Sequence, residues 1–390
     1  MRTHHGIVRA APAAALFFGL TAASPALARQ AEARVDNLAV IIDEERNRAY
    51  QPAIAASVFR GNGLIGLGVR GHRAEGQAEQ ATNDDLFHIG SITKSMTAML
   101  AAMLVEQGSL SWNTTLAEAM PDFAPQMNEL YRPVTIEQML THRAGMPPFT
   151  SGGAPEFAMT RDLSGTPMEQ RAQFARRVLA KHPVTPPGSG YAYSNADVSI
   201  VAAVVEQKSG KSWEELMRTR IFEPLGMSSA GFGWPATPDR PNQPRGHIPG
   251  PNGFAPSGLD DPYRLPLVLA PAGDVHCSVA DLARYGGFHL RALRGEASDP
   301  AILKPETVKY MHSCQKNYAM GWIPAGTPYG EATWHNGSAG TFFAQILLVP
   351  PADIGVVAVS NAGTGATSCN NVCLTLLKKY AKAPDKPQVP

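Results

Sequence analysis

The segment Ile92–Gln107 carries apolar or small side chains on every face of a helix, with Lys94 and Glu106 as its charged residues. A helix that is apolar all round is usually buried, so other elements must surround it. Gly108 follows where such a helix is expected to stop. The chain must therefore build its core around this helix, and the residue that begins it lies deep in the fold.

Composition limits the function classes. The 390 residues include 34 Lys and Arg against 33 Asp and Glu, so the formal net charge is +1. A balance this even lacks the basic surface of a nucleic-acid binder or of a protein bound to a membrane surface. The length predicts a globular protein of two to three domains.

The N-terminus has the layout of a secretory signal peptide. Arg2 and Arg9 precede an apolar stretch, and Ala26-Leu27-Ala28 forms an A-x-A cleavage signal. The apolar stretch is shorter than the roughly 20 residues that a bilayer requires. Residues 1–28 are therefore predicted to be removed. The mature protein is expected to be periplasmic or secreted, with no stable membrane insertion.

Export places the cysteines in a compartment where disulfides persist. They allow three pairings, so one or two disulfides and buried free thiols both remain open. Their spacing is not that of a zinc site, and no metal or other cofactor is expected. The four are Cys277, Cys314, Cys369 and Cys373.

Two strand hairpins are predicted, one near each end of the mature chain. The first joins Ile54–Phe59 to Leu64–Val69, and the second joins Phe342–Val349 to Gly355–Ser360. Helical patterns occur at 30–48, 134–141, 167–181, 196–209, 212–220 and 370–382. Ten prolines between Pro235 and Pro271 predict one long surface loop. This order indicates an α+β sheet domain interrupted by a helical one.

Ser-x-x-Lys is the strongest catalytic pattern, and it occurs at Ser91/Lys94 and at Ser313/Lys316. Ser91 opens the buried helix, which places Lys94 one turn further on the same face. A helix N-terminus also supplies free N–H groups and a positive dipole end. Ser91 is thus a candidate nucleophile, and its alternative role is that of an N-cap.

Two further groups accompany this pattern. Tyr193 and Asn195 lie in a tight loop ahead of a helix, from which both can point into a common cleft. His335, Asn336, Gly337 and Ser338 precede a strand. A glycine there allows a substrate backbone to lie close along the sheet edge.

These motifs resemble those of the β-lactamase-related serine hydrolases. That superfamily includes class C β-lactamases, D-alanyl-D-alanine carboxypeptidases, D-aminopeptidases and family VIII esterases. Secondary signatures at residues 140–147, 221–227 and 318–322 agree, and the similarity runs in order through nearly the whole mature chain. The three main motifs are Ser91-Ile92-Thr93-Lys94, Tyr193-Ser194-Asn195 and His335-Asn336-Gly337.

The resemblance implies a β-lactamase/transpeptidase-like fold, with an antiparallel sheet flanked by helices beside an all-helical domain. The sheet domain would span roughly 29–90 and 265–385, and the helical domain roughly 91–264. The active site would lie in the cleft between them.

The resemblance also implies roles for the motif residues. Ser91 would be acylated, and Lys94 would lower the pKa of Tyr193 and shuttle protons. Tyr193 would be base toward Ser91 and acid toward the leaving group. Asn195 would hold Lys94 and a substrate carbonyl, and the N–H groups of Ser91 and Ser338 would form the oxyanion hole.

Departures from the class C pattern bear on the substrate. His335-Asn336 replaces Lys-Thr, and a histidine is less reliably cationic at neutral pH, so attraction for a substrate carboxylate is expected to be weak and pH-dependent. This ranks peptidase or esterase activity above β-lactamase activity.

We therefore expect an exported serine hydrolase acting on a D-alanyl peptide or a small ester. The alternative is a weakly catalytic homologue that binds peptidoglycan fragments or a partner protein. A small-molecule or peptide substrate is expected, without nucleic acid, and the oligomeric state stays open.

Three other polar residues are expected to have structural roles or to line the cleft. His142 is interpreted as a structural turn residue and His88 as a wall residue of the cleft. Asp274 either lines the cleft or caps a turn.

Overall fold

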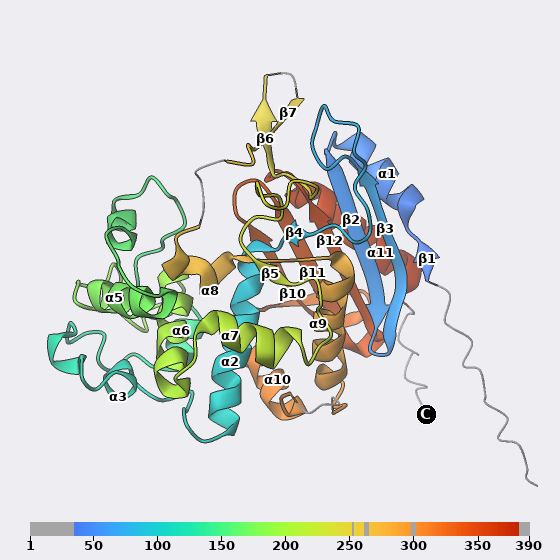
Figure 1. Cartoon of the computed structure of the whole chain (residues 1–390). Coiled ribbons are helices and arrows are strands. Elements are labelled where there is room, and N and C mark those ends of the chain that lie inside the picture. The colour runs from blue at the N-terminus through green and yellow to red at the C-terminus, as the bar shows by residue number, and fades with distance from the viewer. Residues whose placement is uncertain (1–34, 252, 261–264, 298–301, 382–390) are drawn as a thin grey trace, which may run out of the picture. The chain divides into compact units, whose positions relative to one another are not determined.

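A seven-stranded sheet forms the largest element of the described residues (Figure 1). Its strand order is β1-β3-β2-β12-β11-β10-β9, and all neighbours are antiparallel except the short parallel pair β1 and β3. The strands are β1 (Asp36–Asn37), β2 (Ala53–Arg60), β3 (Gly63–Gly71), β9 (Ile323–Thr327), β10 (Gly330–Ser338), β11 (Phe343–Val349) and β12 (Ile354–Ser360).

The computed structural model describes residues 35–251, 253–260, 265–297 and 302–381. The predicted signal peptide, residues 1–28, lies outside these ranges. From Val35 onward the chain forms one compact unit. The division into a sheet domain and a helical domain stays a prediction.

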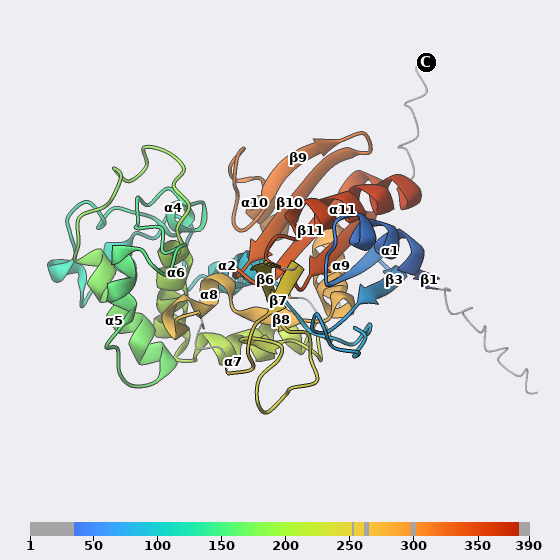
Figure 2. The same ribbon diagram turned by 90° about the horizontal axis from the view of Figure 1, so that it is seen from above.

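Helices cover both faces of the sheet. On one face, α1 and α11 lie side by side (Figures 1 and 2). They pack on the β2 side chains Ile54, Ala56 and Val58. The alternate side chains Ala53 and Ala55 face the other core, which contains α9 and α2. This alternation is the period of two that a strand buried on both faces requires.

The helices have the following bounds: α1 (Ala39–Arg48), α2 (Thr93–Glu106), α3 (Leu116–Ala119), α4 (Ile136–Leu140), α5 (Pro167–Leu179), α6 (Asn195–Ser209), α7 (Trp213–Met217), α8 (Ala270–Gly273), α9 (Val279–Leu293), α10 (Pro305–Ser313) and α11 (Ala366–Tyr380). A 3₁₀ turn, η1 (Gly90–Ile92), precedes α2, and another, η5 (Leu267–Leu269), precedes α8.

The prediction of a buried central helix is confirmed. Every side chain of α2 from Thr93 to Leu104 is buried, and Gly108 follows the helix with a φ of 72°. Both predicted hairpins are also confirmed, as β2 with β3 and as β11 with β12.

The prediction of one long surface loop between Pro235 and Pro271 is wrong. This stretch contains a two-stranded ribbon, β6 (His247–Gly250) with β7 (Gly253–Pro256), and it ends in the first turn of the buried helix α8. Pro271 stands in the first turn of α8, where a missing N–H breaks no helical hydrogen bond. The region supplies backbone to the active site.

A second, three-stranded sheet lies beside α2, with the order β4-β8-β5. Its strands are β4 (Phe87–His88), β5 (Gly231–Phe232) and β8 (Val275–Cys277). Such short strands leave little pattern in a sequence. All four cysteines are free thiols; Cys277, Cys369 and Cys373 are buried, and Cys314 is half-buried.

Candidate active site

Ser91 lies within the 3₁₀ turn at the entrance of α2. Gly90 before it has a φ of 51°, a left-handed conformation that favours glycine. The Ser91 hydroxyl makes no capping hydrogen bond to η1 or α2, so the alternative role as an N-cap is wrong. The half-buried hydroxyl is thus available for chemistry.

The amine of Lys94 is held by three oxygen atoms. Its Nζ lies 3.0 Å from Ser91 Oγ, 2.7 Å from Asn195 Oδ1 and 2.7 Å from the carbonyl oxygen of Ala272 in α8. The side chain is 1% exposed. This geometry fixes the nitrogen beside the serine.

Burial lowers the pKa of Lys94 well below its usual value, and the nearby charge of Asp197 acts in the opposite direction. A neutral amine has two N–H bonds and one lone pair. When the two carbonyl-type oxygens of Asn195 and Ala272 accept those N–H bonds, the lone pair is left for the Ser91 hydroxyl. Lys94 is therefore placed to take the Ser91 proton.

Tyr193 lies next to the Lys94 amine. Its ring centre is 4.8 Å from Lys94 Nζ, and its hydroxyl forms a hydrogen bond with Ser91. Burial raises the pKa of Tyr193, although the Ser91 hydrogen bond acts against this. The prediction that Lys94 lowers the pKa of Tyr193 is wrong. The phenol stays protonated and fits the role of a proton donor better than that of a resting base.

Asn195 is the first residue of α6, and its side-chain amide bonds two different partners. Its Oδ1 accepts the Lys94 hydrogen bond, and its Nδ2 donates to the carbonyl oxygen of Phe149 at 2.7 Å. The preceding Ser194 caps the helix by accepting from the N–H groups of Ala196 and Asp197. The cap fixes the first turn of α6 and with it the direction of the Asn195 side chain.

The end of β10 packs against the Ser91 turn. A Cβ placed on Gly337 would lie 2.0 Å from the carbonyl oxygen of Ile89 and 2.5 Å from the Ser91 nitrogen, and one placed on Gly90 would lie 2.4 Å from the Ser338 nitrogen. The backbone nitrogens of Ser91 and Ser338 are thus brought to the same place because two side chains are missing. This is the arrangement that an oxyanion hole requires.

His335 does not face the cleft as a free cation. It is 3% exposed, its Nε2 bonds the Tyr318 hydroxyl at 3.0 Å, and its Nδ1 bonds the carbonyl oxygen of Asn336. Burial lowers the pKa of His335 to about 3. The expected pH-dependent attraction for carboxylates near neutral pH is therefore wrong, because the imidazole is neutral there. Asn336 is half-buried opposite Gln345 of β11.

Several residues at the site were missed or undervalued in the sequence. His142 has the left-handed φ of 56° of a turn residue, but it also packs its ring 4.4 Å from that of Tyr193. Its partner Asp197 lies within the helical pattern 196–209, where the sequence gives no sign of a role at the site. Nothing in the sequence marks the Ala272 carbonyl, whereas Tyr318 belongs to a segment noted for its resemblance.

His88 is buried, as expected for a wall residue, and lies 3.3 Å from Asp274. Asp274 contacts this ring through Oδ1, so it takes part in the wall beside the Ser91 turn.

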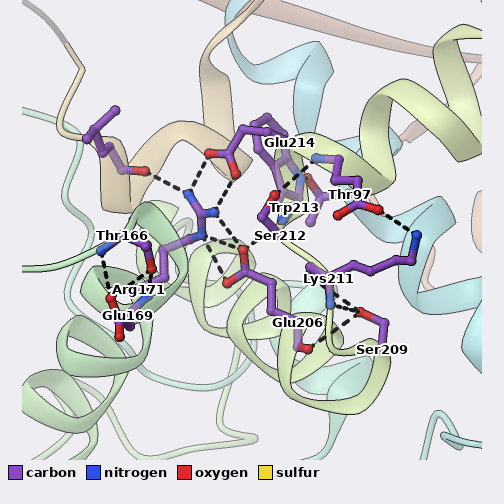
Figure 3. Close-up of polar contacts among 12 residues, drawn as sticks. Thr97, Thr166, Glu169, Arg171, Glu206, Ser209, Lys211, Ser212, Trp213 and Glu214 are labelled. Carbon is purple, nitrogen blue, oxygen red and sulfur yellow. Dashed lines mark hydrogen bonds and ion pairs between the residues drawn. The ribbon is translucent and has the colours of Figure 1, made fainter.

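A buried ion-pair network supports the helix that supplies the Ala272 carbonyl. Arg171 of α5 bonds Glu206 of α6 at 2.6 Å and Glu214 of α7 at 2.7 Å (Figure 3). It also donates to the carbonyl oxygen of Leu267 at 3.3 Å, just ahead of α8.

A second support for α8 starts at Trp213. Its Nε1 donates to the Thr97 hydroxyl at 3.0 Å, and Thr97 donates to the carbonyl oxygen of Pro271 at 2.7 Å. Together with Arg171, this contact fixes the position of the oxygen that Lys94 uses.

Within the described ranges, no group of His, Cys, Asp or Glu has the arrangement of a metal site. In the same ranges, no helix has the length and apolar character needed to cross a bilayer.

Comparison with known proteins agrees with this geometry. The family model described as Beta-lactamase matches residues 38–370. Penicillin-binding protein 4 of Amycolatopsis lactamdurans is 28% identical over 353 residues, covering 87% of this chain and 88% of its own. Esterase EstB of Burkholderia gladioli is 29% identical over 323 residues, covering 75% and 74%.

Among solved structures, the octameric penicillin-binding protein homologue from Pyrococcus abyssi superposes with a TM-score of 0.70 and 26% identity. The match covers 89% of this chain and 77% of that one.

Proposed function

The chain belongs to the Beta-lactamase family of serine hydrolases, and from this premise we propose that it cleaves small uncharged esters and amides through an acyl-enzyme on Ser91. The observation that carries the proposal is the 3.0 Å contact between Lys94 Nζ and Ser91 Oγ, made by an amine whose pKa burial lowers. A neutral amine at this distance can remove the serine proton as the bond to the substrate forms.

The reaction begins when Ser91 Oγ attacks the carbonyl carbon of the substrate and its proton passes to Lys94 Nζ. The carbonyl oxygen becomes an oxyanion, which the N–H groups of Ser91 and Ser338 stabilise. Collapse of this intermediate breaks the bond to the leaving group, which takes a proton from the Tyr193 hydroxyl. The Lys94 proton then returns Tyr193 to its neutral form, and the acyl group stays on Ser91.

Water completes the cycle by attacking the acyl carbon. One proton of the water passes to Lys94 Nζ, and Ser91 Oγ takes that proton as it leaves the acyl carbon. Acid, free serine and neutral lysine result, so protons and electrons balance over the two steps.

The preference for uncharged substrates follows from His335. A cation in the third motif would attract a carboxylate-bearing substrate, but this ring is buried and its pKa is lowered to about 3. Both of its nitrogens already have partners. The name of the relative EstB supports ester hydrolysis as the first candidate activity.

A D-alanyl peptide is the second candidate, and one observation favours it. Strand β10 pairs with β9 only as far as Trp334, so residues 335–338 lack a β9 partner on that edge. An extended peptide can add to such an edge through its backbone. The similarity to penicillin-binding protein 4 supports the same candidate.

The test compares Ser91→Ala with the wild type on p-nitrophenyl butyrate and on a D-alanyl-D-alanine peptide, with intact-protein mass recorded after rapid quenching. We expect ester turnover, an acyl adduct on the wild type, and neither on the variant. Ser313→Ala is the matched control, because it removes the serine of the second Ser-x-x-Lys pattern. Undiminished ester hydrolysis by Ser91→Ala would refute the proposal.

We further propose that the protein is exported and cleaved after Ala28, on the basis of the A-x-A pattern. Expression of the full chain in a bacterial host followed by N-terminal sequencing tests this. A mature protein that begins at Arg29 supports export, and an intact Met1 in the cytoplasmic fraction contradicts it.

A further inference from the structure

A carboxyl group and an imidazole are buried together behind the catalytic residues. Asp197 Oδ2 of α6 lies 2.9 Å from His142 Nδ1, and neither side chain is exposed to solvent. The mechanism proposed above uses neither residue. Because a buried charge is costly unless it is fully paired, the position of the shared proton matters for the site.

A backbone contact indicates which atom carries that proton. The N–H of Ser194 donates to His142 Nδ1 at 3.3 Å. A ring nitrogen that accepts a hydrogen bond from an amide carries no hydrogen of its own. The proton between His142 and Asp197 then belongs to the carboxyl group, which donates it to Nδ1.

One unpaired oxygen agrees with this assignment. Among the described residues, Asp197 Oδ1 is buried without a hydrogen-bond partner, and so is His142 Nε2, which has no partner in either tautomer. An ionised carboxylate with one bare oxygen in such a place would be strongly destabilised, whereas the carbonyl oxygen of a protonated acid has a much smaller desolvation cost. Burial raises the pKa of Asp197 and lowers that of His142, which favours the uncharged forms of both.

The charged and titratable groups around the pair come from several elements. Lys94, Arg143 and His335 face the imidazole, and Lys94 also faces the carboxyl group. A charge on Asp197 would raise the pKa of three nearby tyrosines, Tyr131, Tyr191 and Tyr318. Because charge on Asp197 would raise the pKa of Lys94, an uncharged Asp197 keeps the lysine available as a base.

The imidazole also determines where the catalytic tyrosine lies. The His142 ring is 4.4 Å from the Tyr193 ring and 4.8 Å from the Tyr318 ring. With Nδ1 as acceptor, the hydrogen of the neutral ring is on Nε2. The left-handed backbone at His142 and the hydrogen bond to Asp197 hold the ring there.

We propose that Asp197 is protonated in the resting enzyme and donates to His142 Nδ1, so that the two residues form an uncharged positioning unit for Tyr193 and Lys94. This inference deepens the proposed function and rests on it for the roles of Tyr193 and Lys94. The protonation state itself can be measured without any substrate.

The first experiment is infrared spectroscopy of the full mature protein at pH 7, comparing the wild type with Asp197→Asn. We expect the carbonyl stretching band of a protonated carboxylic acid in the wild type and its loss in the variant. Ser199→Ala is the control, because it removes another buried polar group from α6, one without a hydrogen-bond partner among the described residues, and should keep the band. A wild-type spectrum without an Asp197-dependent band would overturn the proposal.

The second experiment is the pH dependence of ester hydrolysis. If Asp197 is uncharged, Asp197→Asn leaves the charge beside Lys94 unaltered and the acid limb of kcat/KM stays in place. If Asp197 is ionised, its removal lowers the pKa of Lys94 and moves the acid limb down by about one pH unit. Such a shift would contradict the proposal.

Positioning is tested with His142→Asn, because asparagine tolerates the left-handed backbone at this residue. We expect kcat to fall about tenfold to 100-fold with KM within twofold, since Tyr193 loses the ring against which it packs. An unaltered kcat would remove the positioning role. Failure of the serine mechanism would appear separately, as hydrolysis by Ser91→Ala, and would leave the infrared result intact.

Discussion

The hydroxyl of Tyr318 lies 3.0 Å from Nε2 of His335, while Nδ1 of the same ring bonds the carbonyl oxygen of Asn336. The backbone carbonyl can only accept, so Nδ1 carries the hydrogen and Nε2 accepts from the tyrosine. The imidazole is therefore a neutral part of the cleft wall.

His335 should reduce stability in acid. Its folded pKa of about 3 is lower than the ordinary value, so below pH ~6.5 the unfolded chain binds a proton that the folded protein excludes. Stability then falls by about 1.4 kcal/mol for each pH unit until the folded pKa is approached. We expect His335→Gln to unfold at a less pH-dependent temperature between pH 7 and 4. His182→Gln, on the surface, is the control and should follow the wild type; a His335→Gln curve parallel to the wild type would contradict this prediction.

Lys94→Arg should abolish turnover although it keeps a positive charge. Arginine cannot release a proton in a protein, so no lone pair is available for the Ser91 hydroxyl. We expect kcat/KM for p-nitrophenyl butyrate to fall by about 10²–10⁴. Lys208→Arg on the exposed surface of α6 is the matched control. Turnover by Lys94→Arg close to that of the wild type would show that Lys94 acts as a cation and not as a base.

Tyr193→Phe should distinguish amides from activated esters. An amine must be protonated as it leaves, whereas p-nitrophenolate leaves without a proton. We therefore expect the loss in kcat for an anilide to exceed that for a p-nitrophenyl ester of the same acyl group by about tenfold or more. Tyr191→Phe, in the same loop and exposed, should affect both substrates alike. Equal losses for both substrates with Tyr193→Phe would exclude a role in protonating the leaving group.

Arg171→Met should destabilise the fold strongly. The change leaves Glu206, which is 1% exposed, without the cation that it pairs with at 2.6 Å. Loss of one partner from a buried ion pair costs about 3–5 kcal/mol, and urea unfolding measures it. Lys181→Met, at an exposed position two residues after the end of α5, should stay within about 0.5 kcal/mol of the wild type.

A rescue separates charge from packing in this network. Arg171→Met combined with Glu206→Leu removes both charges of the buried pair and leaves only the partly exposed Glu214, so part of the lost stability should return. If the double variant is as unstable as the sum of the two single variants, the arginine contributes through packing alone.

Local patterns predicted much of the fold. The apolar helix that follows Ser91 and the two hairpins depend on residues that are close in the chain, and each is confirmed. Helix α9 was missed, although Ser278 caps it and accepts from the Asp281 N–H three residues on, which is a recognisable start signal.

Contacts between distant segments could not be predicted in this way. A backbone carbonyl such as that of Ala272 has no residue-type signature, so its contact with Lys94 appears only in the folded chain. Burial also reversed two expectations from residue type, since desolvation raises the pKa of Tyr193 and makes His335 neutral. The identity of the site residues was readable in the sequence, whereas their protonation states depended on the surrounding core.

Two of the three oxygens that hold Lys94, those of Asn195 and Ala272, lie 101 and 178 positions from it along the chain. A chain released or truncated before α8 cannot assemble this environment, so its serine has no activated form. Acylation of Ser91 by a reactive ester therefore reports whether the fold around Lys94 is complete. During refolding, the return of acylation should mark the docking of α8, later than the return of helical signal, and an incompletely folded chain stays chemically inert.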